Sequence, residues 1–74
     1  MYIELSSGHV FASNSVKSIT PITKEDDHDY FYTFKVIGVG FIVNFYSDDV
    51  YMDKAAKDRF IALHKEAKEK LLGV

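Results

Sequence analysis

The chain has 74 residues, of which 47% are hydrophobic and 15% aromatic, and it contains no cysteine. This length allows one domain, residues 1–74, and the aromatic content excludes a disordered chain. The lack of thiols excludes disulfides, thiolate nucleophiles and zinc–thiolate sites. The net charge of −2 hides a division: residues 1–52 hold three Lys and seven acidic residues, which gives −4, whereas residues 53–74 hold six basic and four acidic residues, which gives +2.

Short strands are predicted over the first part of the chain. Apolar and polar residues alternate over residues 2–6, and Ser7–Gly8 supplies a turn into a second run at residues 9–12. The apolar step across Val16–Ile19 breaks strict alternation and predicts a bulge or bend. Pro21 cannot donate a ladder hydrogen bond, so we expect it at a sheet edge or a strand end.

The strongest strand signal lies in the middle of the chain. Tyr30–Ile37 and Phe41–Tyr46 predict the central hairpin of the sheet, joined by the three-residue loop Gly38–Gly40. Because side chains alternate between the two faces of a strand, the set that contains Lys35 and the set that contains Asn44 should face solvent.

The pattern changes near Asp53 from a period of two residues to the period of a helix. Asp49 or Asp53 is placed to cap the helix, which should run over about residues 53–72 and end at Gly73. Its apolar stripe comprises Met52, Ala56, Phe60, Leu63, Ala67 and Leu71. The predicted fold class is α+β, with an antiparallel sheet of four or five strands in residues 1–52 and one C-terminal amphipathic helix packed on one face.

A single helix covers only one face of a sheet, so the other face is left in water unless something else covers it. The residues that parity assigns to this uncovered side are largely apolar, and an exposed apolar patch usually marks an interaction site. They are Tyr2, Phe11, Phe31, Ile37, Ile42 and Tyr46. We interpret them as a surface that binds another protein or that associates with a second copy of the chain to form a homodimer. The alternative is that the sheet curls and takes these side chains into one enlarged core.

Two acidic segments form a second candidate surface for a partner. One follows the strand predicted over residues 16–22 and the other follows the central hairpin, and both are too polar to be buried. Their acidic residues are Glu25, Asp26, Asp27, Asp29, Asp48 and Asp49. They are either solvated loops or a mimic of a phosphate backbone that occupies the nucleic-acid groove of another protein.

The sequence has no arrangement typical of an enzyme, because it lacks a glycine-flanked nucleophile and a phosphate-binding glycine loop. Adjacent acidic residues without calcium-loop spacing do not predict a metal site, and no cofactor is expected. We expect His64 to pack on the flank of the helix, and His9 shows no partner in the sequence.

Nucleic-acid binding is an alternative that the charge pattern does not favour. Basic residues line the predicted helix and aromatic rings on a sheet can stack bases, but the acidic strand region would repel phosphate. The basic residues are Lys54, Lys57, Arg59, Lys65, Lys68 and Lys70. The longest apolar stretch, residues 36–45, is too short to cross a membrane, and the first residues do not form a signal peptide. We therefore expect a cytoplasmic protein.

The layout resembles that of short β-meander-plus-helix proteins common in bacteriophages and bacterial mobile elements. The resemblance is carried by Met-x-Ile-x-Leu-Ser-Ser-Gly at residues 1–8, by Ser15–Ile19, by the aromatic hairpin and by the C-terminal helix. It spans nearly the whole chain but includes no diagnostic motif. It implies a small host-directed inhibitor, such as an anti-CRISPR or other anti-defence protein, that binds a host protein stoichiometrically in the host cytoplasm. The alternatives are a nucleic-acid-binding module and a self-associating structural protein.

Overall fold

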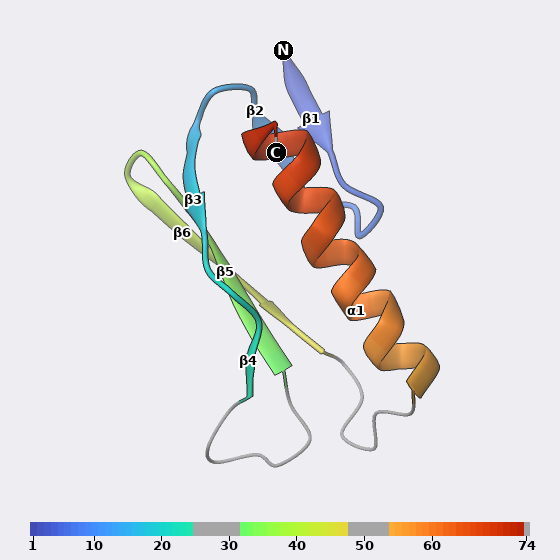
Figure 1. Ribbon diagram of the computed structural model, residues 1–74. Coiled ribbons are helices and arrows are strands. Elements are labelled where there is room, and N and C mark those ends of the chain that lie inside the picture. Colours follow the sequence, from blue (N-terminus) through green and yellow to red (C-terminus); the bar gives the residue numbers. More distant parts are fainter. Residues whose placement is uncertain (25–31, 48–53, 74) are drawn as a thin grey trace.

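The computed structural model describes residues 1–24, 32–47 and 54–73 and has an α+β fold (Figure 1). Its elements are the strands β1 (Tyr2–Glu4), β2 (Val10–Ala12), β3 (Val16–Ile19), β4 (Thr23–Lys24), β5 (Tyr32–Gly38) and β6 (Phe41–Tyr46), followed by the helix α1 (Lys54–Ala67) and a short π-helical segment, η1 (Lys68–Leu72). The predicted fold class is confirmed. The predicted capping residues Asp49 and Asp53 lie outside the described residues.

The larger sheet is antiparallel and is built around β5. Strand β6 pairs with β5 along one side, with Phe34 opposite Phe45, and β3 and β4 share the other side. The predicted irregularity is confirmed, because the β3–β5 register shifts between Val16 and Ser18. Pro21 lies between β3 and β4, where the edge of the sheet is interrupted.

The turn between β5 and β6 is tighter than the sequence predicted. Gly38 is the last residue of β5 and pairs with Phe41, so the loop has two residues, Val39 and Gly40, rather than three. Gly40 has φ of +82°, a conformation that glycine adopts at no steric cost. The ring of Phe41 packs over Gly38 and occupies the space that a side chain at Gly38 would need.

Strands β1 and β2 form a separate two-stranded sheet, which is a departure from the single sheet we expected. Tyr2 lies opposite Ala12, and the chain leaves β2 through a turn in which Asn14 has φ of +66°. Asparagine is one of the few residues other than glycine that enters this left-handed region routinely. The turn lets the chain pass from the small sheet to the edge of the large one.

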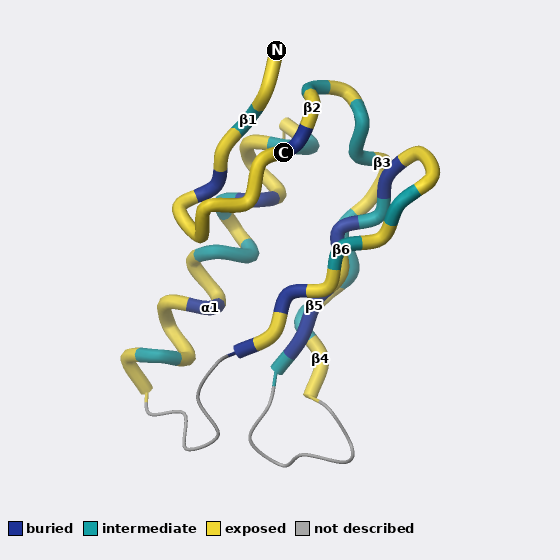
Figure 2. The backbone as a smooth tube through the Cα atoms, turned by 180° about the vertical axis from the view of Figure 1, so that it is seen from behind, coloured by how far each residue is buried: buried dark blue, intermediate teal, exposed yellow. Residues whose placement is uncertain are grey.

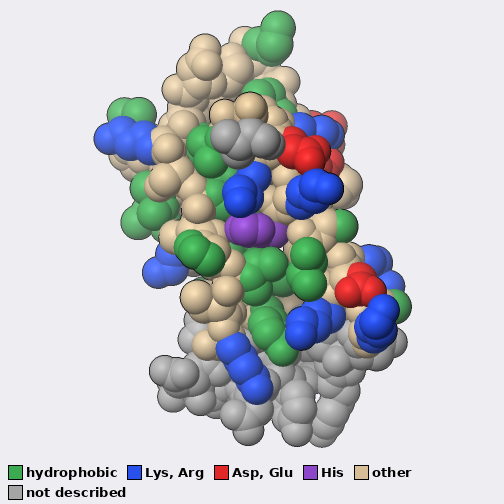
Figure 3. All heavy atoms as spheres, viewed as in Figure 1, with side chains coloured by type: hydrophobic (Ala, Val, Ile, Leu, Met, Phe, Trp, Pro, Cys, Tyr) green, Lys and Arg blue, Asp and Glu red, His purple; other side chains and the backbone are tan. Residues whose placement is uncertain are grey.

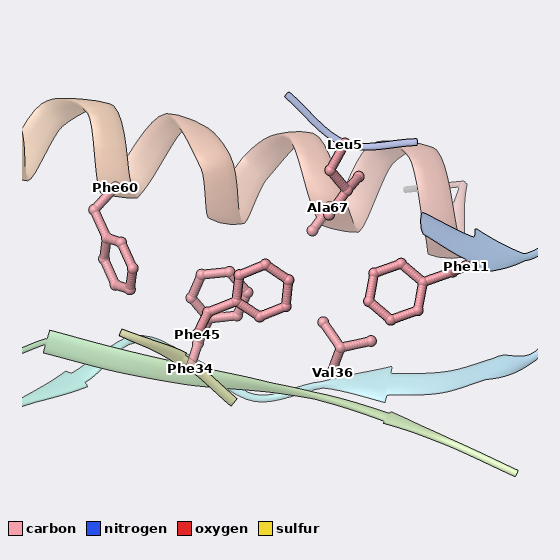
Figure 4. Close-up of a cluster of buried hydrophobic side chains, with 7 residues drawn as sticks. All are labelled: Leu5, Phe11, Phe34, Val36, Phe45, Phe60 and Ala67. Atoms are coloured by element: carbon pink, nitrogen blue, oxygen red, sulfur yellow. The ribbon is translucent and has the colours of Figure 1, made fainter. Parts of the chain in front are cut away.

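The helix and the β1–β2 hairpin lie together on one face of the large sheet (Figure 1). The core lies between these layers. Buried positions occur in all three parts (Figure 2), and their side chains meet in the space between the helix and the sheet (Figure 4). The core consists of Leu5, Phe11, Phe34, Val36, Phe45, Phe60 and Ala67. The rings of Phe34 and Phe45 stack with centroids 4.7 Å apart, and the Phe60 ring is 5.3 Å from Phe34. Aromatic side chains bury large areas, so these rings dominate the energetics of the core.

The predicted position of Phe11 is wrong. Its side chain is 6% exposed and belongs to the core, with its ring 6.1 Å from that of Phe41 and 6.5 Å from that of Phe45. The alternation of side chains shows which residues share a face only among strands of the same sheet. Strand β2 belongs to the smaller sheet, so its faces are not those of β5 and β6. The hairpin lies over the covered face and directs Phe11 toward the large sheet, so for this residue the alternative of an enlarged core is correct.

The apolar stripe of the helix is confirmed over the described residues. Phe60 and Ala67 are buried and Leu63 is half-buried, whereas Met52 lies outside the described residues. Gly73 ends the helix with φ of +73°, and its N–H donates to the carbonyl of Glu69. This left-handed glycine is the predicted helix terminator.

A carboxylate on the helix holds the hairpin in place. Both oxygens of Glu66 accept from the backbone N–H of Ser6 at 3.2 Å, and Oε1 also accepts from the Ser6 hydroxyl at 2.7 Å. The Lys70 ammonium lies 2.9 Å from Glu66 Oε2 and forms an ion pair with it. The hydrogen bond from the Ser6 hydroxyl, followed by that from Lys70, lowers the pKa of Glu66. Glu66 therefore links the hairpin turn to the helix as an anion.

Candidate functional site

The outward side of β5 and β6 is the candidate interaction surface. Lys35 lies opposite Asn44 and Ile37 lies opposite Ile42, with Tyr46 further along β6. These five residues are called the open face below. Thr33 lies opposite Tyr46 on the same side but is buried. The predicted exposure is confirmed for Lys35 and Asn44 themselves, whereas Thr33 on the side of Lys35 is buried.

The open face combines apolar ends with a polar centre. Ile42 is 60% exposed and Tyr46 is 54% exposed, whereas Ile37 is half-buried. The pair Lys35 and Asn44 lies between them. The apolar surface is therefore smaller and more divided than the sequence predicted, although Ile42 and Tyr46 leave large apolar groups in water.

The other predicted surface residues have different positions. Tyr2 is 76% exposed, but it belongs to β1 in the smaller sheet and so is not part of the open face. Phe11 lies in the core, and Phe31 lies outside the described residues. All the acidic residues predicted to form the second surface, 25–27, 29, 48 and 49, also lie outside them. The structure therefore brings together Ile37, Ile42 and Tyr46 from the original set.

The backbone of β6 adds a feature that sequence reasoning missed. The Ser47 N–H donates to the Tyr32 carbonyl at 2.9 Å, which identifies these opposite residues as a hydrogen-bonded pair. Such pairs alternate along an antiparallel ladder, so the next hydrogen-bonded pair toward the hairpin turn is Phe34 with Phe45. It follows that the N–H and C=O groups of Ile42, Asn44 and Tyr46 point away from β5.

This outer edge of β6 is unpaired within the described part of the chain. No described strand pairs with it, and its outward groups make no backbone hydrogen bond to another described segment. The stretch Phe41–Tyr46 contains no charged residue and no proline. That composition, together with parity, is the sequence signal from which an open strand edge could have been suspected.

Both described histidines have structural contacts. The Thr20 carbonyl lies 2.9 Å from His64 Nε2, and because a carbonyl only accepts, this nitrogen donates. The His64 ring also meets the Phe34 ring edge-on at 4.8 Å, which confirms its predicted packing role. His9 Nδ1 lies 2.8 Å from the Ser7 hydroxyl, and its ring is 4.3 Å from that of Phe45. The sequence did not reveal these partners of His9.

The basic residues of the helix are interspersed with acids, and Figure 3 shows Lys and Arg side chains scattered over this side of the molecule. The ammonium groups of Lys54, Lys65 and Lys70 lie 3.4, 4.0 and 2.9 Å from the carboxylates of Asp58, Glu69 and Glu66, respectively. The Lys57 ammonium lies 5.2 Å from the centre of the Tyr32 ring, a cation–π contact. Exposed ion pairs contribute little stability, but their carboxylates neutralise part of the positive charge that binding of a polyanion would require.

Residues 1–24, 32–47 and 54–73 contain no cluster of three or more His, Asp or Glu side chains able to hold a metal ion. Among the described residues, no helix combines the length and the apolar character needed to cross a membrane.

No protein-family model, curated protein or solved structure matches this chain. The resemblance to proteins of phages and mobile elements therefore stays a prediction.

Proposed function

We propose that this protein is a small binding module that associates stoichiometrically with another protein through its open face. One observation carries the proposal. The helix and the β1–β2 hairpin both pack on the same side of the large sheet, which leaves Ile42 and Tyr46 more than half exposed on the other side. Together with the half-buried Ile37 they share one face of the sheet, and apolar groups that are exposed together on one face mark a candidate interaction site.

The chemistry of the open face suits a protein partner. Tyrosine is enriched among residues that dominate binding energy, because its ring buries a large area while its hydroxyl keeps a hydrogen-bond partner. Ile42 and the half-buried Ile37 supply a second apolar contact, and Lys35 with Asn44 adds hydrogen-bonding groups between them. A stable interface buries roughly 800 Å² on each partner. The open face would therefore be the centre of the interface, with surrounding residues forming its rim.

The narrower role of a host-directed inhibitor is an extension of this proposal. It is supported by the sequence resemblance and by the small size of the chain, since an inhibitor that acts by occupying a surface needs a binding face and no catalytic machinery. It predicts a bacterial protein as the partner.

Affinity capture with matched variants tests the binding proposal. We would immobilise the wild-type chain, Ile42→Asp and Ile61→Asp, and expose each to a bacterial lysate. Ile61 is 46% exposed on the helix and is the matched control for Ile42. The expected result is one protein retained in about equimolar amount by the wild type and by Ile61→Asp, and lost with Ile42→Asp.

Circular dichroism of all three chains checks that they are folded. Equal capture by the three would contradict the role of the open face. Steep, salt-sensitive retention on a polyanion resin, together with loss of protein capture, would favour nucleic acid as the partner instead.

A further inference from the structure

The two edges of the large sheet differ in how far they are protected from pairing with another strand. The edge formed by β3 and β4 has a register shift after Val16, a break at Pro21 and a final strand of two residues. Bulges, prolines and short strands are the usual devices that prevent edge pairing. The β6 edge has none of these features: its six residues pair with β5 in continuous register, without proline or charge.

We propose that two copies of this chain form a homodimer by antiparallel pairing of their β6 edges, with the two-fold axis passing beside Asn44. This inference goes beyond the proposed function, because it concerns the strand edge and names a second copy as its occupant. The resulting sheet would continue from one protomer into the next.

The register follows from the outward backbone groups. These groups belong to Ile42, Asn44 and Tyr46, and opposite residues with outward groups exchange two hydrogen bonds. With Asn44 on the axis, Asn44 pairs with its own copy and each Ile42 pairs with a Tyr46. All outward N–H and C=O groups are then satisfied. With the axis at Val43, Tyr46 would lie opposite residue 40, and with the axis at Phe45, Ile42 would lie opposite residue 48. Neither of these positions belongs to β6, so only an axis at Asn44 pairs all the outward groups within β6.

The side chains agree with the same register. On the open face each Ile42 would pack against a Tyr46, an aliphatic–aromatic pair of the kind that stabilises neighbouring strands. The two Asn44 amides would meet on the axis, where each can donate to the carbonyl oxygen of the other. No charged residue of β6 faces its own copy, so association incurs no like-charge repulsion along the strand.

This arrangement closes on itself. Because both protomers use the same edge, the interface is isologous and leaves no second β6 edge to extend the assembly. The remaining outer edge of the large sheet is formed by β3 and β4, which the bulge and Pro21 protect. The expected species is therefore a dimer and not a fibre.

A charge swap at the axis tests the proposal by light scattering and sedimentation over a range of concentrations. The wild type should have twice the 8.5 kDa mass of one chain. Asn44→Asp and Asn44→Lys should each weaken dimerisation about tenfold or more, because like charges would lie directly opposite each other. An equimolar mixture of the two variants should recover a dimer, since opposite charges then meet on the axis.

Ser18→Asp is the control, because it places the same charge on the protected edge strand β3 and should leave the dimer unchanged. A wild type that is monomeric at all concentrations would overturn the inference. So would a dimer that ignores both charges at residue 44, or one that the mixture fails to restore while circular dichroism shows folded chains. A monomer that still captures its partner through Ile42 would refute the dimer alone, whereas a dimer that captures no protein would refute the proposed function alone.

Discussion

The two faces of the large sheet have opposite roles although neighbouring residues of the same strands supply them. On β5, Phe34 and Val36 are 1% and 0% exposed, while Lys35 between them is exposed. On β6, Phe45 is buried whereas Tyr46 remains 54% exposed. The difference arises because the helix and the β1–β2 hairpin both cover the same face.

This comparison separates stability from binding. Substitutions on the covered face should destabilise the fold, because they remove packed apolar volume. Substitutions on the open face should leave the fold intact and affect only association.

The largest effect is expected for Phe34→Ala. The Phe34 ring contacts Phe45, Phe60 and His64, so its removal would leave a cavity at the centre of the core. The free energy of unfolding should fall by roughly 3–5 kcal/mol, a large part of the stability of a small domain. Urea denaturation followed by circular dichroism measures this loss. Tyr46→Ala is the control on the open face, and an equal loss in both variants would break the comparison between the faces.

A smaller effect is expected for Gly38→Ala at the end of β5. A methyl group at residue 38 would overlap the Phe41 ring and lie 2.6 Å from the Ser15 carbonyl oxygen. The ring can rotate away, but the backbone carbonyl must shift as well, so we expect a loss of about 1–3 kcal/mol in the free energy of unfolding. Val39→Ala in the same turn is the control, because Val39 is 67% exposed. Equal stability of Gly38→Ala and the wild type would show that the turn adapts freely.

Much of the fold was predictable because its signals are local. Alternation fixed the two faces of β5 and β6, the apolar step after Val16 located the bulge, and the helical period located the buried positions of Phe60 and Ala67. Each of these signals depends on the geometry of one element or one hairpin, which the period of the sequence encodes directly.

The position of the β1–β2 hairpin was not predictable from periodicity. It depends on contacts between distant residues, such as Ser6 with Glu66, and on the left-handed turn at Asn14. Alternation assigns Phe11 to one side of β2 but cannot say against which layer that side packs. The same limit applies to the candidate site. The sequence predicted that Ile42 and Tyr46 are exposed, yet the unpaired edge of β6 became evident only from the strand order.

The link between the hairpin and the helix predicts a pH-dependent effect of about 1 kcal/mol. Because folding lowers the pKa of Glu66, its carboxylate contributes stability above the pKa of the unfolded chain, and this contribution is lost as the pH falls through the folded value. In Glu66→Gln the hydrogen bonds of an anion become those of a neutral amide, which costs roughly 1 kcal/mol at pH 7.

The measurement is the difference in unfolding free energy between the wild type and Glu66→Gln, from urea titrations at pH 7 and at about pH 3. The difference should shrink at the lower pH, because fewer wild-type chains then carry the ionised carboxylate. Glu69→Gln is the control, since Glu69 lies 4.0 Å from Lys65 on the exposed side of the helix. A difference that stays constant with pH would mean that Glu66 acts through its shape and not through its charge.

The smallest effect on stability is expected for Ile42→Asp, which changes the chemistry of the open face completely. Ile42 is 60% exposed, and its backbone N–H and C=O do not take part in pairing with β5. The free energy of unfolding should therefore change by about 0.5 kcal/mol, most of it from the poor strand propensity of aspartate. The titration is done on dilute chain, below the concentration at which copies associate, because association would add to the apparent stability of the wild type. Under those conditions, a loss of unfolding free energy comparable to that of Phe34→Ala would place Ile42 in the core. A small loss combined with abolished partner capture would establish that stability resides on one face of the sheet and binding on the other.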